Sequence, residues 1–548
     1  MFNWLKSGSP WIWLTGGAVS ISLLSVLGLL LLIGWKGLSY FWPAPLYQWK
    51  TDQDEILIGQ LYAQEYVPIS HLREMNITLP EAVVEKGLVK RLSIKVANRD
   101  LYPADFVSIL EIDVLERSKP QGWAVIERSR GGDFYGYPVG YKQANGHVSD
   151  EITLLTDQGL MYAASVREEI TKIINQQIRQ YSAQAEQLRF EQRRRKLNSE
   201  LDEAFNQRFD QQTNALNQKL SKAENELDEL RNKLKQQGLL VRDMTGAVTF
   251  IPLDQMLDIW YPNHLSLVDK VSLWTKQIWK FLSEDPRESN SEGGVFPAMF
   301  GTVLLVIIMS VIVMPLGVVA AVYLHEYAKN NALTRVIRVA VINLAGVPSI
   351  VYGVFGLGFF VYTLGNSIDQ LFYAERLPAP TFGTPGLLWS ALTLAVLTLP
   401  VVIVATEEGL SRIPSSVRHG SLALGATQFE TMWRIVLPMA SPAIITGLIL
   451  AVARAAGEVA PLMLVGAVKL ASSLPVDDQF PFLHLERKFM HLGFHIYDVG
   501  FQTTNIESAR PLVYATAFLL VTVIVGLNLT AISIRNNLRE KYRTLGQD

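Results

Sequence analysis

The sequence predicts a mainly α-helical, polytopic membrane protein with six transmembrane helices and an external β-rich lobe that carries a coiled-coil helical hairpin. Three observations lead to this fold class. Both ends of the chain contain apolar runs longer than about 18 residues, enough to cross a bilayer as helices. Residues 43–295 carry 31 Lys+Arg and 37 Asp+Glu, whereas the rest of the chain carries only 18 and 14. Within this charged region, residues 160–237 contain no Gly or Pro. The pattern excludes an ordinary soluble enzyme and a single-anchor receptor.

Residues 1–42 are predicted to form a cytoplasmic N-terminus and the first transmembrane helix. An apolar run extends from Trp11 to Trp35, and the tryptophans near its ends suit the headgroup region of a bilayer. A cleaved signal peptide is the alternative. The run is longer than the apolar core of a signal peptide, and no small-residue cleavage site follows it. We therefore predict an uncleaved anchor.

Residues 43–294 are predicted to form an external insertion. From Leu92 to about Tyr141, apolar and polar residues alternate as in half-buried strands, and Gly131–Gly132 indicates a hairpin between two of them. A coiled coil is predicted at about 160–237, because apolar residues there recur at alternating spacings of four and three. These residues are Leu216, Leu220, Ala223, Leu227, Leu230 and Leu234.

The coiled coil is predicted to fold back on itself. A single helix over 160–237 would be roughly 115 Å long, and the sequence offers no equally long return path to the membrane. The apolar repeat loses its phase across 191–196, and Ser199-x-x-Asp202 resembles a helix N-cap. We place the tip near Arg193–Ser199, with two arms of about 50 Å. A broken, partly flexible helix is the alternative.

Five further spans form a predicted transmembrane core over residues 295–535, followed by a cytoplasmic tail at 536–548. Six spans place both termini on one side. Eleven Lys or Arg residues lie in short segments on that side against five opposite, so both termini are predicted to be cytoplasmic and residues 43–294 periplasmic. The five spans are 296–324, 339–366, 387–406, 439–468 and 512–534.

The cytoplasmic loop 407–438 has the pattern of two short helices separated by glycine, with proline at the next membrane entry. It resembles the coupling loop of ABC-importer permeases (type I core), whose Glu-Ala-Ala triplet precedes a glycine and an Ile-x-Leu-Pro ending. His419 replaces the acidic residue of that triplet, so this sequence departs from the family pattern at the position where the family's Glu would pair with the ATPase. The residues that the resemblance assigns to ATPase coupling are Arg418, His419, Gly420, Ser421, Gly425, Leu437 and Pro438.

Three further stretches resemble the phosphate-specific permeases, in particular their A-type subunit (the PstA family), in a long form with an enlarged N-terminal region. These stretches are 292–302, 346–353 and 453–462. The resemblance implies a second permease subunit, two copies of an ATP-binding subunit, a periplasmic phosphate-binding protein and the bacterial inner membrane as surroundings. It implies a transport subunit rather than an enzyme.

Arg454 and Glu458 are the predicted substrate-pathway residues. An ionised arginine inside a bilayer costs roughly 3 kcal/mol even on lenient scales, and such residues usually face a protein interior or an aqueous path. A spacing of four brings the two side chains within pairing distance on a helix. A guanidinium offers paired donors that suit phosphate oxygens. A structural ion pair is the alternative. Pro348 and Ser349, at a predicted helix break, are further candidates for lining the path.

Several classes of chemistry find no support in the sequence. It has no cysteine, no spacing of histidines typical of a metal site and no basic tract that indicates nucleic acid. No Gly-x-x-x-x-Gly-Lys-Ser/Thr motif is present, so ATP is expected to bind another subunit. We expect no catalytic residue, metal or cofactor on this chain. The predicted function is that of a permease in an ATP-driven phosphate importer. A permease for another oxyanion, or a scaffold whose hairpin bridges periplasmic partners, are the alternatives.

Overall fold

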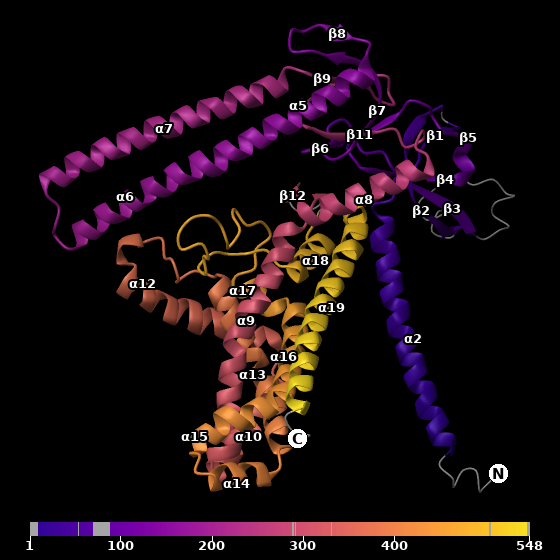
Figure 1. Cartoon of the computed structure of the whole chain (residues 1–548). Helices are drawn as coiled ribbons and strands as arrows, with labels where there is room; N and C mark the ends of the chain where they lie inside the picture. Colours follow the sequence, from indigo (N-terminus) through magenta and orange to yellow (C-terminus); the bar gives the residue numbers. More distant parts are fainter. Residues whose placement is uncertain are drawn as a thin grey trace. The chain divides into compact units, whose positions relative to one another are not determined.

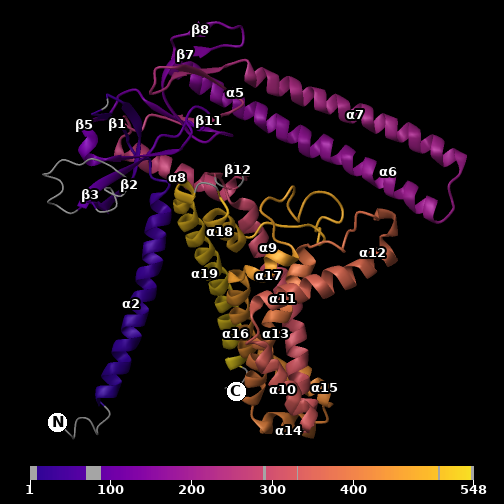
Figure 2. The same ribbon diagram turned by 180° about the vertical axis from the view of Figure 1, so that it is seen from behind.

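The computed structural model describes residues 9–52, 54–69, 88–287, 290, 292–329, 331–503 and 506–544. Its contacts divide the chain into two compact units. The membrane unit comprises residues 1–40 and 281–548, and the lobe unit comprises residues 41–280. The mainly helical fold with a β-rich region matches the predicted fold class (Figures 1 and 2).

The membrane unit has six helices that are long and apolar enough to cross a membrane in the part of the chain that the structure describes, as predicted. They extend over Trp11–Ser39, Phe296–Tyr327, Ser349–Phe372, Leu387–Ser411, Gln428–Gly457 and Ala509–Leu538. The helical segments of this unit are α2 (Ser9–Ser39), α9 (Phe296–Val322), η4 (Tyr323–Tyr327), α10 (Ala332–Leu344), α11 (Ser349–Phe355), η5 (Gly356–Gly365), α12 (Asn366–Phe372), η6 (Ala374–Arg376), α13 (Leu387–Ser411), α14 (Ser415–Ala423), α15 (Gln428–Thr431), η7 (Met432–Val436), α16 (Leu437–Gly457), α17 (Ala460–Val465), α18 (Leu492–Phe501) and α19 (Ile506–Thr544).

Two of the predicted span boundaries differ from the structure. The third span was predicted at 339–366, but its first residues belong to α10, a separate amphipathic helix, and the span begins after Pro348. The fifth span was predicted to reach residue 468, but α16 ends at Gly457 because Glu458 adopts an extended backbone conformation. Proline at the start of α11 and at the start of α17 suits a helix beginning, where its missing N–H costs nothing.

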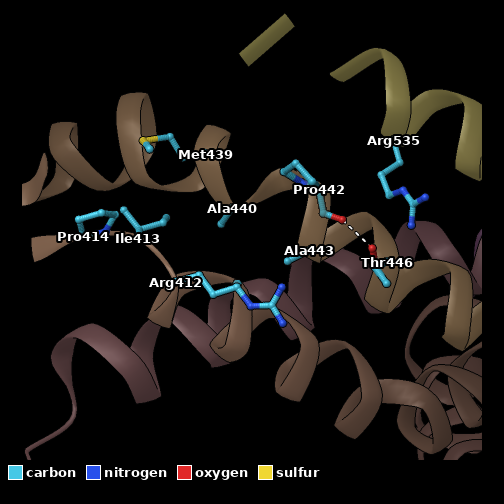
Figure 3. A pocket seen from close by; sticks show the side chains of 10 residues that line it. Arg412, Ile413, Pro414, Met439, Ala440, Pro442, Ala443, Thr446 and Arg535 are labelled. Atoms are coloured by element: carbon cyan, nitrogen blue, oxygen red, sulfur yellow. Dashed lines mark hydrogen bonds between the residues drawn. The ribbon is translucent and has the colours of Figure 1, made fainter. Parts of the chain in front are cut away.

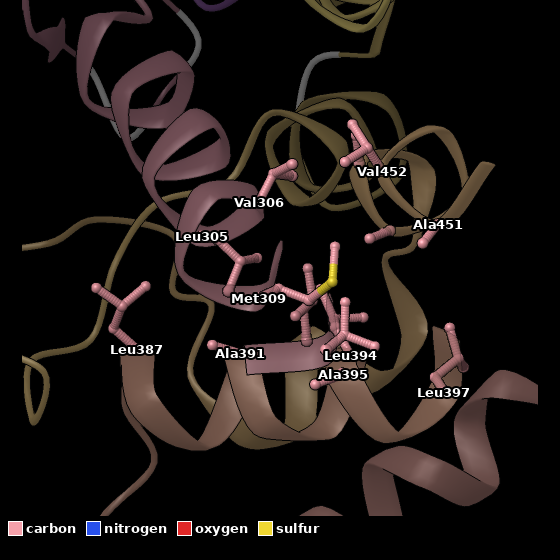
Figure 4. Close-up of a cluster of buried hydrophobic side chains, with 14 of the residues drawn as sticks. Leu305, Val306, Met309, Leu387, Ala391, Leu394, Ala395, Leu397, Ala451 and Val452 are labelled. Atoms are coloured by element: carbon pink, nitrogen blue, oxygen red, sulfur yellow. The ribbon is translucent and has the colours of Figure 1, made fainter. Parts of the chain in front are cut away.

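The core of the membrane unit lies between α9, α13 and α16 (Figure 4). Close helix packing there depends on small residues, since lipid tails give apolar helices little hydrophobic reason to associate. A Cβ at Gly317 of α9 would lie 2.6 Å from Val402, and one at Gly447 of α16 would lie 2.7 Å from Ala405. Fully buried members of this core include Leu305, Met309, Leu394, Leu397 and Ala451.

The first helix, α2, packs against α19 near its C-terminal end. A Cβ at Gly37 would approach the backbone of Ala515 to 2.9 Å, and one at Gly34 would approach the ring of Phe518 to 3.0 Å. Apolar side chains along the rest of α2, such as Leu24 and Leu31, are exposed. An apolar exposed helix of this length is suited to lipid or to another membrane helix.

The lobe unit contains two antiparallel sheets. One has the strand order β4-β3-β2-β1-β5 and the other the order β10-β9-β7-β6-β11, with β8 paired to β7. Trp49 on β1, between β2 and β5, is fully buried. The predicted hairpin at Gly131–Gly132 joins β6 to β7, and both glycines have positive φ. The strands are β1 (Leu46–Thr51), β2 (Ile56–Pro68), β3 (Leu88–Lys95), β4 (Phe106–Leu110), β5 (Val114–Ser118), β6 (Ala124–Arg128), β7 (Phe134–Lys142), β8 (Val148–Ser149), β9 (Gly238–Arg242), β10 (Val248–Pro252) and β11 (Met256–Trp260).

A helical hairpin projects from the second sheet (Figure 1). Its first arm is α5 (Ile152–Lys172), a π-helical segment η2 (Ile173–Ile178) and α6 (Arg179–Leu197); its second arm is α7 (Glu203–Lys235). The turn follows Leu197, and Asp202, not Ser199, caps α7 by accepting a hydrogen bond from the Phe205 amide at 2.6 Å. The predicted apolar seam is buried at Leu216, Ala223, Leu227, Leu230 and Leu234.

The base of the hairpin and the second sheet share one hydrophobic core. Ala163 and Val166 of α5, with Leu230 and Leu234 of α7, pack in the same cluster as strand residues such as Ile126. The sheet and the hairpin base therefore stabilise each other.

The two ends of the lobe unit are joined by one side chain. Asn263, after β11, accepts a hydrogen bond from the Leu46 amide at 3.1 Å and donates to the Leu46 carbonyl at 3.0 Å. It also donates to the Pro120 carbonyl at 2.8 Å. Helix α8 (Leu267–Ser283) follows, and Lys280 on it lies 2.8 Å from Glu127 and 2.9 Å from Asp258. The residues where the chain enters and leaves the lobe are thus fixed beside each other.

Candidate functional site

Arg454 and Glu458 form an ion pair at the C-terminal end of α16. The Nε atom of Arg454 lies 3.7 Å from Oε1 of Glu458, and both side chains are partly buried. The pair spans the end of the helix, because α16 stops at Gly457 and Glu458 is its C-cap residue. A cation in the last turn suits the negative end of the helix dipole. The distance exceeds that of a hydrogen bond, so the two charges are only loosely held.

Tyr352 connects this pair to the start of the third span. Its ring is buried in the same core as Ala455, and its hydroxyl donates to the Leu344 carbonyl at 2.6 Å. Helix α11 also packs closely on α17, because a Cβ at Gly353 would lie 2.7 Å from Pro461.

Pro348 and Ser349 lie at the beginning of the third span rather than at a break within it. Pro348 is the N-cap residue of α11 and is exposed, whereas Ser349 is partly buried one turn before Tyr352. The structure records no polar contact between these two residues and Arg454 in the part of the chain it describes. Tyr352 is the residue of this segment that sequence reasoning missed, since an aromatic residue among apolar neighbours gives no distinctive signal.

The loop 407–438 contains the two short helices that its pattern predicts, α14 and α15. Gly425 lies between them with φ of +89°, in the left-handed region that favours glycine. Thr427 caps α15, and Glu430 completes a capping box with it. The π-helical segment η7 then leads into α16, which has proline in its first turn.

Arg418 and Ser421 point into the protein instead of forming an outer surface. The Nη2 atom of Arg418 lies 2.9 Å from Glu326 of η4 and donates to the Leu410 carbonyl at 2.8 Å. Ser421 is buried, and its hydroxyl lies 2.9 Å from that of Thr431. Both residues therefore fix α14 against its neighbours. Glu326 could not be assigned from sequence, because its partner lies 92 positions later.

The outer face of this loop is apolar and exposed. Leu424 is 91% exposed, and the rings of Phe429 and Trp433 stack at 6.4 Å with 69% and 65% of their surface accessible. His419 and Gly420 are also exposed, and a Cβ at Gly420 would meet nothing within 4 Å. We call Leu424, Phe429 and Trp433 the apolar face. Such an exposed apolar group on a polar loop is typical of a protein contact surface.

Leu437 and Pro438 begin α16 beneath this face. Leu437 packs against a buried cluster that includes Leu410 and Val436. The Pro438 carbonyl accepts a hydrogen bond from the Ser441 hydroxyl at 2.7 Å. Pro442 follows inside the helix and has no N–H to donate, so the serine supplies the missing hydrogen bond. These two residues connect the apolar face to the membrane core.

Besides the pair of Arg454 and Glu458, a cluster of polar residues is buried around α18. His491 and His495 are buried, and Nε2 of His491 and both ring nitrogens of His495 lack a hydrogen-bond partner. Burial lowers the pKa of each histidine to about 4. Asp498 lies 3.1 Å from Lys469 and accepts a hydrogen bond from Asn290 at 3.2 Å. The histidines are thus interior groups of the membrane unit.

The described residues contain no group of three or more His, Cys, Asp or Glu side chains that could hold a metal ion. His484, in the loop between α17 and α18, lies 3.0 Å from Asp477 and 3.1 Å from Glu486. Arg487 also contacts Asp477. These contacts cross-link the loop between α17 and α18.

Six candidate membrane helices define a multi-pass membrane protein, and comparison with known proteins places it among the permeases of the inner membrane. The family model for the inner membrane component of binding-protein-dependent transport systems matches residues 313–543. The phosphate transport system permease protein PstA 1 of Mycobacterium tuberculosis is 33% identical over 308 residues, which cover 56% of this chain and 90% of that protein. The chain belongs to the PstA family of transport permeases.

The chain is also similar to a second bacterial protein and to a chain of a solved structure. The probable ABC transporter permease protein YqgI of Bacillus subtilis is 31% identical over 258 residues, covering 46% of this chain and 81% of that protein. A chain from the inward-facing MetNI methionine ABC transporter is 19% identical with a TM-score of 0.32, covering 48% of this chain and 98% of that one. The score is too low to support an argument. Permeases of this family are transport components, not catalysts.

Proposed function

We propose that the chain is the permease subunit of an ATP-driven inorganic phosphate importer, in which it forms half of the translocation path. The phosphate transport names of its relatives support the substrate. The observation that carries the proposal is the loosely held pair of Arg454 and Glu458 at the interrupted end of α16. An arginine at such a position is costly unless it faces protein or water, which favours a functional role.

Arg454 binds the phosphate oxygens in transit, and Glu458 limits how tightly they are held. The structure shows no hydrogen bond from the Arg454 guanidinium within the described ranges, so its donors remain available to an anion. Paired N–H groups match two oxygens of phosphate in one plane. Glu458 competes for the same cation, and this competition allows the anion to leave. Pro348 and Ser349 line the path near Tyr352, at the start of the third span.

ATP is hydrolysed by two copies of a separate ATP-binding subunit, which dock on the cytoplasmic loop. The apolar face, together with His419 and Gly420, supplies the contact surface. Movement of this surface reaches the membrane core through Leu437 and Pro438. The Arg418–Glu326 pair keeps α14 attached to η4, so the loop moves together with the helices that it joins.

The remaining parts of the importer are a second permease subunit and a periplasmic phosphate-binding protein. The positive charges of the short loops support a membrane orientation with both termini in the cytoplasm and residues 43–294 in the periplasm. The hairpin of the lobe unit serves as a scaffold for a periplasmic partner. Its own buried core and its two helical arms, of about 70 and 50 Å, favour a rigid spacer over a flexible linker.

Transport by the variant Arg454→Glu tests the proposed path. We expect loss of phosphate uptake in cells, because the anion would meet a carboxylate, together with normal assembly of the four-subunit core. Sulfate uptake and phosphate competition by sulfate, measured in parallel, identify the oxyanion. Uptake at the wild-type rate would exclude Arg454 from the path. Failure of assembly would instead favour a structural ion pair.

A further inference from the structure

A pocket of about 470 Å³ opens between α13, α16 and α19, at the end of the membrane unit that carries α14 (Figure 3). Its wall includes Arg412, which follows the last turn of α13, and Arg535 on α19. The other wall is formed by residues in the first turns of α16. Three candidate membrane spans thus contribute to one cavity near their ends.

The pocket is lined by positive charge, and among the described residues its lining contains no acidic side chain that would balance this charge. Arg412 and Arg535 are the two charged residues among those that line it, and no acidic side chain is among them in the described chain. Arg535 makes one long hydrogen bond, 3.4 Å, to the neighbouring Asn536, and no ion pair is recorded for either guanidinium among the described residues. Two guanidinium groups at one pocket repel each other unless an anion lies between them.

The remaining lining is largely apolar and continues along the membrane helix. Met439, Pro442, Ala443 and Thr446 follow spacings of three and four, so they lie on one face of α16. Thr446 donates its hydroxyl proton to the Pro442 carbonyl at 2.8 Å and so satisfies its own donor (Figure 3). From Met439 to Thr446 this strip extends about 10 Å along the helix axis.

We propose that this pocket binds an anionic glycerophospholipid, with the headgroup phosphate between Arg412 and Arg535 and an acyl chain along the α16 strip. Each half of the site fits one half of the ligand. The guanidinium fork matches a phosphate diester, and the strip offers apolar contact over several methylene groups. A free phosphate ion would use the two arginines and leave the strip unoccupied, so the two halves together favour the lipid. The site is separate from the proposed transport path.

Lipid retention by the purified complete transporter tests this proposal. The complex is placed in nanodiscs of phosphatidylcholine with or without phosphatidylglycerol, extracted in detergent, and its bound lipid is counted by native mass spectrometry. Wild type should retain phosphatidylglycerol over phosphatidylcholine. Each change, Arg412→Gln or Arg535→Gln, should weaken retention about fivefold, and the double variant about thirtyfold. Arg434→Gln, which alters an exposed arginine outside the pocket, should have no effect.

Each other result overturns the proposal. Equal retention of phosphatidylglycerol by the double variant would show that the arginines bind no lipid. Displacement of the lipid by millimolar inorganic phosphate would identify a site for the free anion. Weaker co-purification of the ATP-binding subunit, with lipid retention unchanged, would assign the arginines to a protein contact. If the double variant fails to assemble, the two single variants provide the same comparison.

Discussion

Arg454 and Glu458 approach to 3.7 Å across the point where α16 ends, so the two charges belong to different backbone conformations. In a continuous helix a pair with this spacing would be a fixed feature of one surface. Here Glu458 is attached to the segment between α16 and α17 and can move with it. The distance between the two charged groups therefore changes whenever the segment between α16 and α17 moves.

Exchange of the two charges should distinguish a transport site from a structural ion pair. The double variant Arg454→Glu with Glu458→Arg retains both charges but reverses their order along the chain. We expect assembly at wild-type levels and phosphate uptake reduced at least tenfold, because the cation moves from the last turn of α16 to the extended residue that follows it. Uptake is measured with radiolabelled phosphate. Full recovery of uptake relative to Arg454→Glu alone would support a structural pair.

Gly425 is expected to be intolerant of a side chain for backbone reasons alone. Its φ is +89°, and a Cβ there would meet nothing within 4 Å. Gly425→Ala should therefore cost about 1–2 kcal/mol through left-handed strain, and it should lower phosphate uptake per ATP hydrolysed. Gly526→Ala is the matched control, since that residue is helical, lies outside the loop and has equally open surroundings. Identical coupling ratios in the two variants would contradict this account.

The pair of Arg418 and Glu326 should stabilise the loop without contacting the ATP-binding subunit. Both side chains are about four-fifths buried, at 19% exposure. Arg418→Met should destabilise the complex by about 1–3 kcal/mol, because it leaves a buried carboxylate without its cation. The double variant with Glu326→Gln should recover part of this loss. Thermal unfolding in detergent provides the measurement.

His419→Ala is the comparison for this pair, because that side chain is exposed. It should leave the unfolding temperature unchanged and weaken binding of the ATP-binding subunit. An Arg418→Met variant that unfolds normally yet loses the subunit would instead place Arg418 at the interface.

The stability of the membrane unit should fall as the pH falls from about 6.5 to about 4. His491 and His495 have a pKa of about 4 when buried and an ordinary value near 6.5 when exposed. Below pH 6.5 the unfolded chain therefore binds more protons than the folded one, and each histidine costs about 1.4 kcal/mol per pH unit until its folded pKa is reached.

Asp498 and Lys469 act on His495 in opposite directions, so burial decides the shift of its pKa. Thermal unfolding between pH 5 and 7.5 measures the slope. His495→Phe should reduce the slope by about half. A slope unchanged by this substitution would show that protonation of His495 does not limit stability.

A shortened hairpin should leave the lobe unit folded. Deletion of residues 182–218 with a short Gly-Ser linker removes the outer arms but keeps the buried base, including Val166, Ile173, Leu227 and Leu230. We expect normal expression and normal phosphate uptake, and loss of any periplasmic partner that co-purifies with the wild type. Loss of uptake with normal expression would assign the hairpin to substrate delivery.

The number and type of elements could be predicted because they depend on local patterns. Charge-free runs predict spans, and the alternating apolar repeat predicts the hairpin, whatever the rest of the chain does. The boundaries at α10 and α16 could not be predicted, because apolar composition continues past the residues where the backbone turns. Glu458 ends a helix in an apolar stretch where nothing in the composition changes.

The candidate site was only partly predictable, because burial of a loop residue depends on distant partners. The pattern indicated both short helices and Gly425 correctly. It could not show that Arg418 and Ser421 face inward, since Glu326 and Thr431 provide the contacts. Nor could it show that His491 and His495 are buried, because an external loop usually exposes its polar residues.

Asn263 has a consequence for how such a chain could have arisen. Because it holds Leu46 beside the residues that follow β11, more than two hundred residues begin and end at nearly the same point in space. A permease that gained the lobe as an insertion would have needed little rearrangement at the insertion point, because the first and last residues of the lobe lie close together. The lobe can therefore be expected to fold when expressed alone, and to be exchangeable between permeases as a single piece.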